Sequence, residues 1–439
     1  MKSDSRSGWG RNLRASVTYL PLNPKNASTF GEANSGLAVG LGRSYGDSSL
    51  NSEGITWTTN ELNHIQIFPE LSFAICGSGV TIGQLERAAM KYGLFPPVVP
   101  GTEYVTVGGA IASNVHGKSH HTDGSFGDHV IEITIINSRA EEIVLSPEGN
   151  NSKEFWATVG GLGLTGAIVK AKIALKPIET NFMEVYETRV RDFNGLLEKL
   201  KEFDSKYSHT VAWVDLSGSY VGRGIVSGAN FASRNELDRK LDPFQEKLPR
   251  HFSLPRKLPF SLINNLTVRL FNTVWYWKPK KRGLTHFQPF LHPLDSIQNW
   301  NSIYGKAGFL QYQFVVPYGE EKILHDFLEL MKLHRVTSFL TVLKRLNEQK
   351  PRFLSFPIAG WTLSIDFPAS HAGFIDALND FDERLASAGG RVYLTKDSRV
   401  KRDRFEEMYL NVSQWKEVKS IMDPGNYWKS EQGNRLGLC

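Results

Sequence analysis

Apolar residues recur along the chain with two different periods. Up to about residue 178 most apolar runs are short and alternate with polar residues, which predicts strands that bury one face. These runs lie at residues 55–77, where turns interrupt them and antiparallel pairing is expected, and at residues 131–136, 142–145 and 167–175. One helix is predicted at residues 81–92, because Thr81 and Gln84 have capping-box spacing and Gly93 follows as a stop signal.

Beyond residue 178 helical and strand patterns are mixed. Amphipathic helices are predicted at residues 193–203 and 321–333, and strands at residues 309–316 and 360–367. This mixture indicates an α+β domain. The pattern therefore divides the chain into residues 1–16, polar and expected to be flexible, a first domain at 17–178, a second domain at 179–399, and a polar helical segment at 400–439.

Two glycine-rich stretches carry the candidate chemistry. Residues 38–51, AVGLGRSYGDSSLN, start as a short buried strand, and the glycines and Arg43 that follow can bring amides and a guanidinium to a pyrophosphate. Residues 100–121, PGTEYVTVGGAIASNVHGKSHH, contain a second glycine pair and a histidine cluster. Two such loops in one region predict one large ligand.

A third glycine-rich stretch excludes one class of site. Gly161, Gly163 and Gly166 fit the GxGxxG pattern, but the residues after them alternate like a strand. A Rossmann site for a nicotinamide cofactor needs a helix at that point, so we exclude it.

Together with FGDH at residues 126–129 and FWATVGGLGLTG at residues 155–166, these stretches resemble the PCMH-type FAD-binding domain of the vanillyl-alcohol-oxidase class. Within that class, GRSYGD, ASNVHGKSHH, YLTKDSR and GWTLSIDFP are similar to the decaprenylphosphoryl-β-D-ribose 2′-oxidase family. The resemblance implies an α+β fold: a two-subdomain FAD-binding domain, a substrate domain with an antiparallel sheet, and a tail that returns to the FAD domain.

The resemblance also implies which residues contact FAD. They are Gly42, Arg43, Ser44, Tyr45, Gly46, Asp47, Ser48, Gly101, Thr106, Gly108, Gly109, Ser113, His116, Ile168 and Tyr393. Asp47 aligns with the histidine that some members of the class link covalently to the flavin. Because an aspartate cannot form that bond, we expect FAD to be bound non-covalently.

Lys396, in YLTKDSR, matches the active-site lysine of the family and is the first catalytic candidate, with His116 and Tyr45 beside it. As a base it needs burial or neighbouring cations to lower its pKa; otherwise it would orient the hydroxyl or stabilise an anion. The residues implied to bind substrate are Lys118, Gln311, Gln313, Lys344, Ser364 and Lys396. Glutamines suit sugar hydroxyls and lysines suit a phosphodiester. Ser364 replaces the cysteine of mycobacterial members, which changes the pocket wall.

The implied reaction is oxidation of the 2′-hydroxyl of a polyprenylphosphoryl pentose to the 2′-keto form. This is the first half of an epimerisation to an arabinose donor for cell-wall polysaccharide, which a short-chain NAD(P)-dependent reductase would complete. Two alternatives stay open. One is a soluble sugar, alditol or aldonolactone oxidase that releases hydrogen peroxide, and the other is a flavin-binding envelope protein without turnover.

Composition and charge bear on location. The sequence shows neither a signal peptide nor an apolar run long enough to cross a membrane, so we expect a cytoplasmic protein or one peripheral to the inner membrane. Cys76 and Cys439 provide neither a disulfide framework nor a zinc site, and the histidines near His120 lack further ligands at metal spacing. The stretch WYWKPKKR, residues 275–282, favours a lipid headgroup boundary, with a nucleic-acid backbone as the weaker reading and a solvated loop as the alternative.

Overall fold

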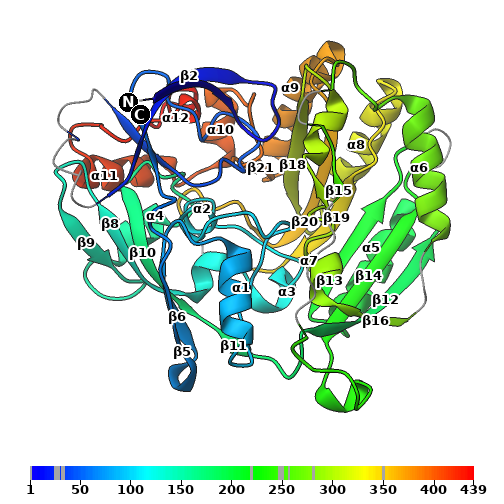
Figure 1. The fold of residues 1–439 in the computed structure, drawn as a ribbon. Helices are drawn as coiled ribbons and strands as arrows, with labels where there is room; N and C mark the ends of the chain where they lie inside the picture. The colour runs from blue at the N-terminus through cyan, green and yellow to red at the C-terminus, as the bar shows by residue number, and fades with distance from the viewer. Residues whose placement is uncertain are drawn as a thin grey trace.

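The computed structural model describes residues 2–23, 30, 35–217, 221–245, 252–255, 258–278, 282–348 and 352–439. Its first domain is built on a four-stranded and a five-stranded sheet (Figure 1). The four-stranded sheet has the order β1-β2-β4-β3. Its strands are β1 (Lys2–Ser7), β2 (Arg14–Pro21), β3 (Gly36–Val39) and β4 (Ile55–Thr58).

The N-terminal segment differs from the expectation. Residues 2–16, which we expected to be flexible, form β1 and the start of β2, paired antiparallel from Lys2 opposite Tyr19 to Ser7 opposite Arg14. Main-chain hydrogen bonds make this pairing, so a polar sequence can form it. The segment is thereby fixed against the first domain.

The second sheet of this domain is antiparallel, in the order β5-β6-β10-β8-β9. Its strands are β5 (Ile65–Phe68), β6 (Phe73–Gly77), β8 (Val130–Ile136), β9 (Glu142–Leu145) and β10 (Ala167–Ala174). The predicted strands are therefore present, but antiparallel pairing throughout residues 55–77 was wrong. β4 lies in the other sheet, parallel to both β2 and β3. Alternation identifies a strand without identifying its partner.

Short helices connect these sheets. α1 (Ile82–Met90) has the predicted capping box, in which Gln84 N donates to Thr81 Oγ1 over 3.1 Å and Thr81 N to Gln84 Oε1 over 2.8 Å. The others are α2 (Val107–Ala112), α3 (His120–Asp123) and α4 (Ser152–Thr158), with the short strand pair β7 (Leu94–Phe95) and β11 (Lys176–Pro177). Because Gly166 leads directly into β10, no Rossmann helix follows the third glycine-rich stretch.

One antiparallel sheet of eight strands forms the second domain, in the order β16-β12-β14-β13-β19-β20-β18-β21. Its strands are β12 (Phe182–Val190), β13 (His209–Val214), β14 (Gly224–Phe231), β16 (Gly283–His286), β18 (Phe309–Pro317), β19 (Thr341–Leu346), β20 (Gly360–Pro368) and β21 (Arg391–Val392). The remaining elements of the domain are α5 (Phe193–Asp204), α6 (Asn265–Trp277), α7 (Phe287–Leu291), α8 (Glu321–Leu333), α9 (Ala372–Ser387), β15 (Phe252–Ser253) and β17 (Ile297–Gln298).

The two faces of this sheet have different environments. On β18, Tyr312 and Phe314 turn to one face and contact Phe327 of α8 and Phe381 of α9. The intervening residues of β18 turn to the opposite face, toward the first domain. Helices therefore cover one face and build a core there, which leaves the other face available for a site.

After the second domain the chain returns to the first. Three helices, α10 (Arg402–Met408), α11 (Val412–Met422) and α12 (Glu431–Leu436), follow β21 and lie over the first domain in Figure 1. From α12, Arg435 Nε and Nη2 each lie 2.9 Å from an oxygen of Asp47, and Nη2 lies 3.0 Å from Asp397 Oδ2. One guanidinium thus joins three segments that are distant in sequence.

Replacing Arg435 should therefore destabilise the protein. Arg435→Leu removes the ion-pair partner of Asp47 and Asp397, whose side chains are 7% and 1% exposed, and we expect a loss of about 3 kcal/mol in the free energy of unfolding. The matched control is Arg404→Leu. Arg404 is as exposed as Arg435, 26% against 24%, but its partner Glu407 is 50% exposed, so the expected loss is below about 1 kcal/mol. Urea unfolding followed by tryptophan fluorescence measures both variants, and equal losses would contradict the argument.

Candidate active site

A cavity of about 1210 Å³ lies between the two domains. The first domain contributes its glycine-rich loops, and the second contributes the uncovered face of its eight-stranded sheet. Nearly all residues proposed from the sequence line this one cavity. They are Gly42, Arg43, Ser44, Tyr45, Ser48, Gly101, Thr106, Gly108, Gly109, Ser113, His116, Lys118, Ile168, Gln311, Gln313, Lys344, Ser364, Tyr393 and Lys396.

The first-domain wall has the features of a cradle for a large polar ligand. A Cβ built on Gly42 or Gly101 would meet no atom within 4 Å, so a side chain at either position would extend into the cavity. Gly42 also has φ +60°, a conformation that favours glycine.

The same wall holds polar atoms that have no partner within the described structure. They are Arg43 Nε, Thr59 Oγ1, Ser78 Oγ and Thr395 Oγ1, all buried and all on residues that line the cavity. Buried polar atoms are normally hydrogen-bonded, so these atoms are suited to groups on a ligand. Glycines that leave room and polar atoms that need partners fit a dinucleotide such as FAD.

Trp9 is a wall residue that the sequence analysis missed. Its ring lies 4.2 Å from the Arg43 guanidinium carbon, which also lies 5.4 Å from the ring of Tyr104. The main chain around Trp9 runs alongside the first glycine-rich loop, and Trp9 N donates a hydrogen bond to Ser44 O over 2.7 Å. A lone tryptophan in a polar N-terminal segment gave no signal for this role.

Two of the predicted FAD contacts face elsewhere. Gly46 lies against the segment after β21, where a Cβ would be 2.0 Å from Asp397 O, so its glycine serves a close approach of two backbones. The Asp47 carboxylate is held by Arg435, and neither residue lines the cavity. The amide of Tyr45 donates to Thr395 O over 3.1 Å, and the loop turns after this residue. Gly46 and Asp47 therefore lie on the side of the loop that faces away from the cavity.

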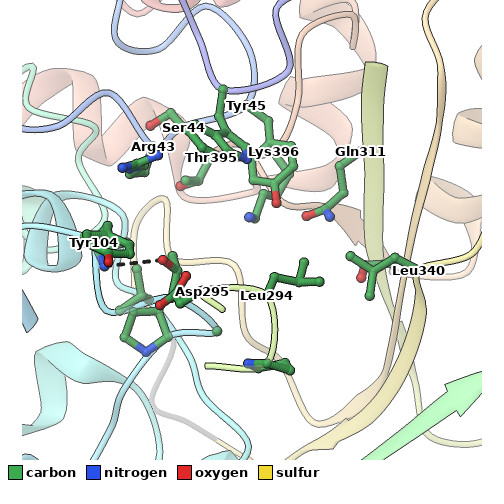
Figure 2. A pocket seen from close by; sticks show the side chains of 18 of the residues that line it. Arg43, Ser44, Tyr45, Tyr104, Leu294, Asp295, Gln311, Leu340, Thr395 and Lys396 are labelled. Atoms are coloured by element: carbon green, nitrogen blue, oxygen red, sulfur yellow. Dashed lines mark hydrogen bonds between the residues drawn. The ribbon is translucent and has the colours of Figure 1, made fainter. Parts of the chain in front are cut away.

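Lys396 and Tyr45 meet at the centre of the cavity. Lys396 Nζ lies 3.6 Å from the centre of the Tyr45 ring, and Figure 2 shows both side chains near Gln311. Burial lowers the pKa of Lys396; the Asp366 carboxylate opposes this shift and Lys344 adds to it. A lowered pKa leaves more of the amine neutral, which is the form that accepts a proton.

Asp366 lies directly behind Gln311 and was not predicted. The two residues are paired across β18 and β20, and Gln311 Nε2 donates to Asp366 Oδ1. This bond fixes the Gln311 side chain, which Figure 2 shows near Tyr45 and Lys396. Burial raises the pKa of Asp366, and Lys396 opposes that shift. The motif GWTLSIDFP contains Asp366, so the cross-strand register was the missing information.

His116 joins Gln313 to Lys344. Its Nε2 lies 3.0 Å from Gln313 Nε2, and its Nδ1 lies 3.1 Å from Lys344 Nζ. Burial, with Lys344 nearby, lowers the pKa of His116 well below its usual value, so the ring is neutral and has one donor and one acceptor. Which ring nitrogen of His116 donates depends on its tautomer, and Lys344 Nζ also lies 3.4 Å from Gly117 O. Burial lowers the pKa of Lys344 to about 8.

Lys118 completes a group of three lysines in the cavity. Its Nζ donates to Leu291 O over 3.0 Å, and burial, with Lys344 nearby, lowers its pKa to about 7. The adjacent histidines have structural partners: Asn347 N donates to His120 Nδ1 over 3.1 Å, and His121 Nε2 lies 2.8 Å from Tyr207 O. Among the described residues, no three His, Cys, Asp or Glu side chains form a group that could hold a metal ion.

The outer part of the cavity is apolar. On one side lie Val268, Phe271 and Trp275 of α6, and on the other the segment 289–300, with Phe290, Leu294 and Ile297 among its residues. Hydrogen bonds fasten this segment to the first domain, the one from Lys118 to Leu291 O among them. Asp295 Oδ2 accepts from Glu103 N over 2.6 Å, and His292 Nε2 lies 2.9 Å from Glu86 Oε1. Residues 279–281 of the predicted aromatic and basic stretch lie outside the described residues.

The amino-acid sequence of this chain is similar to those of known flavoenzymes. A family model described as an FAD binding domain matches residues 33–146. The chain is 36% identical over 453 residues to the decaprenylphosphoryl-β-D-ribose oxidase of Mycolicibacterium smegmatis, covering 98% of this chain and 97% of that protein. It is 30% identical over 370 residues to an uncharacterised protein of Streptomyces coelicolor, covering 82% and 100%. L-gulonolactone oxidase 5 of Arabidopsis thaliana is 28% identical over 222 residues, covering 49% and 34%.

The position of Asp366 generates a prediction about pH. In Asp366→Asn the carboxylate that keeps the pKa of Lys396 up is removed, so this pKa falls further. If neutral Lys396 is the base, the acid limb of the rate of anaerobic flavin reduction by a hydroxyl donor moves to lower pH, by about one unit. Asparagine can still accept from Gln311, which preserves the geometry.

The control for this experiment is Ser364→Ala. Ser364 also lines the cavity from β20 but is uncharged, so its loss should change the rate and leave the acid limb in place. An acid limb that stays in place in Asp366→Asn would show that the carboxylate does not set the protonation of the base.

Proposed function

Since the chain belongs to the decaprenylphosphoryl-β-D-ribose oxidase family of flavoenzymes, we propose that it oxidises the 2′-hydroxyl of a polyprenylphosphoryl pentose to the 2′-keto form. The similarities confirm the predicted PCMH-type fold, the FAD cofactor and an oxidoreductase that acts on a hydroxyl donor. The identity of the sugar and its lipid is the part that we propose.

The gradient of polarity along the cavity carries this proposal. One part of its lining groups Lys118, Lys344 and Lys396 with Gln311 and Gln313, whereas another part is formed largely by aromatic and aliphatic side chains, Phe271, Trp275, Leu294 and Ile297 among them. Amides suit sugar hydroxyls, amines suit a phosphodiester, and an apolar wall suits an isoprenoid chain. A free alditol or aldonolactone would use neither the cluster of lysines nor the apolar outer wall.

The reaction divides between cofactor and protein. FAD, when bound, accepts the hydride from the carbon that carries the hydroxyl. Neutral Lys396 accepts the hydroxyl proton, so that the alcohol becomes a ketone with both hydrogens accounted for. Gln311, fixed by Asp366, holds the sugar, and Tyr45 lies beneath the lysine and restricts its position. Lys118 and Lys344 bind the phosphate.

The surroundings of the reaction are proposed on the same basis. A keto product calls for a reductase to complete epimerisation, and we propose a short-chain NAD(P)-dependent enzyme as that partner, supplying a cell-wall arabinose donor. None of the helices among the described residues is long and apolar enough to cross a membrane. A lipid-linked substrate resides in a membrane, so we propose that the protein works at the membrane surface.

An anaerobic titration tests the substrate class. Polyprenylphosphoryl-ribose should bleach the flavin absorbance band of the purified holoenzyme, whereas free ribose and xylitol at equal concentration should leave it unchanged, because they lack the phosphate and the lipid. Bleaching by the free polyols would assign the protein to the soluble oxidases. No bleaching by any donor would favour a binding protein without turnover.

The same titration with Lys396→Ala tests the base. We expect the rate of bleaching to fall by about 10²-fold to 10⁴-fold while FAD content is retained. Lys332→Ala, at a solvent-exposed position on α8, is the matched control and should reduce flavin at the wild-type rate. An unchanged rate in Lys396→Ala would remove Lys396 from the mechanism.

The attachment of FAD gives a further prediction. We propose non-covalent binding, because Asp47, at the aligned position of the covalent histidine, has its carboxylate bound to Arg435. Acid precipitation of the holoenzyme should leave all flavin in the supernatant. A covalent flavoprotein of the same class, treated in parallel, should keep its flavin in the pellet. Flavin fluorescence of the denatured polypeptide after gel electrophoresis would contradict the proposal.

A further inference from the structure

Helix α6 exposes an apolar stripe to solvent. Leu266, Leu270, Val274 and Trp277 are 77%, 66%, 62% and 65% exposed, and their spacing of three or four residues places them along one side of the helix. Scattered exposed apolar residues are ordinary on a protein surface, but a continuous stripe on a well-formed helix indicates an interaction.

The exposed stripe adjoins the wall of the cavity. Phe271 and Trp275, each one position beyond an exposed residue, line the apolar end of the active-site cavity, as does Lys278. Thr267 and Lys278 lie between the two apolar stripes at the two ends of the helix, and in the middle turns the stripes are direct neighbours around the helix. Surface and cavity form one continuous apolar path.

The third side of α6 anchors it to the second domain. Val268, Asn272 and Tyr276 are buried, and Asn272 Nδ2 donates to Asp215 Oδ1 over 2.8 Å and to Ser338 O over 3.1 Å. The helix is thus held in place by polar contacts of its own. The helix lies at one side of the molecule (Figure 1).

Cations accompany the aromatic end of the helix. Lys278 Nζ lies 4.7 Å from the Trp275 ring, and the Arg189 guanidinium carbon lies 4.5 Å from the Trp277 ring. Arg282, 63% exposed, follows in the chain. Phe260 and Leu262, which precede the helix in the chain, are exposed as well. Aromatic rings with lysine and arginine beside them are the composition that binds the boundary of an anionic bilayer.

We propose that α6 docks on an anionic membrane through this stripe, and that the lipid chain of the substrate passes along its Phe271 and Trp275 side into the cavity. The inference rests on the proposed lipid-linked substrate and specifies how that substrate reaches the site. A bilayer fits better than a second copy of the chain, because the path leads into the cavity and the cations match acidic headgroups.

Vesicle sedimentation tests the docking face. Wild-type holoenzyme should sediment with phosphatidylcholine vesicles that contain phosphatidylglycerol, and the double variant Leu266→Glu with Leu270→Glu should lose at least about tenfold in partition coefficient. The matched control is Leu410→Glu with Ile421→Glu. These residues are 82% and 72% exposed beside and within α11, at the opposite side of the molecule in Figure 1, and their replacement should have no effect.

A second readout separates docking from chemistry. Flavin reduction by a water-soluble, short-chain prenylphosphoryl-ribose should be equal in wild type and the α6 double variant, whereas reduction by long-chain substrate in vesicles should be slowed only in the variant. If neither substrate reduces the wild type, the proposed function fails. The docking inference is overturned if the α6 double variant reduces flavin with vesicle-bound substrate at the wild-type rate. It is also overturned if the variant sediments with vesicles like the wild type and differs only in self-association.

Discussion

One guanidinium ties the tail of this protein to both walls of its active site. Arg435 of α12 binds Asp47, which ends the first glycine-rich loop, and Asp397, which directly follows Lys396. Both carboxylates are buried, and a buried carboxylate that loses its ion-pair partner is costly, so the ion pairs with Arg435 hold these segments together. Arg435 therefore holds the loop that fits FAD and the lysine proposed as base at a fixed separation. It does so from outside the cavity, since it does not line the cavity itself.

The eight-stranded sheet supplies the rest of the geometry through simple alternation. On β18, Tyr312 and Phe314 go to the helical core, whereas Gln311 and Gln313 between and beside them go to the cavity, so core packing and site position are set by the same register. Gln311 and Asp366 face each other because β18 and β20 pair antiparallel at that point. A slip of one residue along β18 would place Tyr312 and Phe314 in the cavity and Gln311 and Gln313 in the core.

Features fixed by neighbouring residues were predictable from the sequence, and features fixed by distant ones were not. The cap formed by Thr81 and Gln84 is a local pattern, and the structure contains it. The parallel pairing of β4, the stacking of Trp9 on Arg43 and the turn of Asp47 toward Arg435 all depend on partners far away in the chain. Motif resemblance located the wall residues but assigned Gly46 a ligand contact, because a motif does not distinguish a close approach to a ligand from one to backbone.

The three lysines in the cavity have a consequence for proton linkage. Lys118 and Lys344 have pKa values lowered to about 7 and about 8, so both are partly neutral near neutral pH before any ligand is bound. A phosphodiester beside them stabilises their charged forms, and binding an anionic substrate then takes up protons from the buffer, so that affinity increases as pH falls. Lys396, as a base, needs the opposite state. Substrate binding is thus favoured at lower pH and proton abstraction at higher pH, although both depend on amines of one cluster. The enzyme works best in the pH interval where Lys118 and Lys344 are still charged and Lys396 is already neutral.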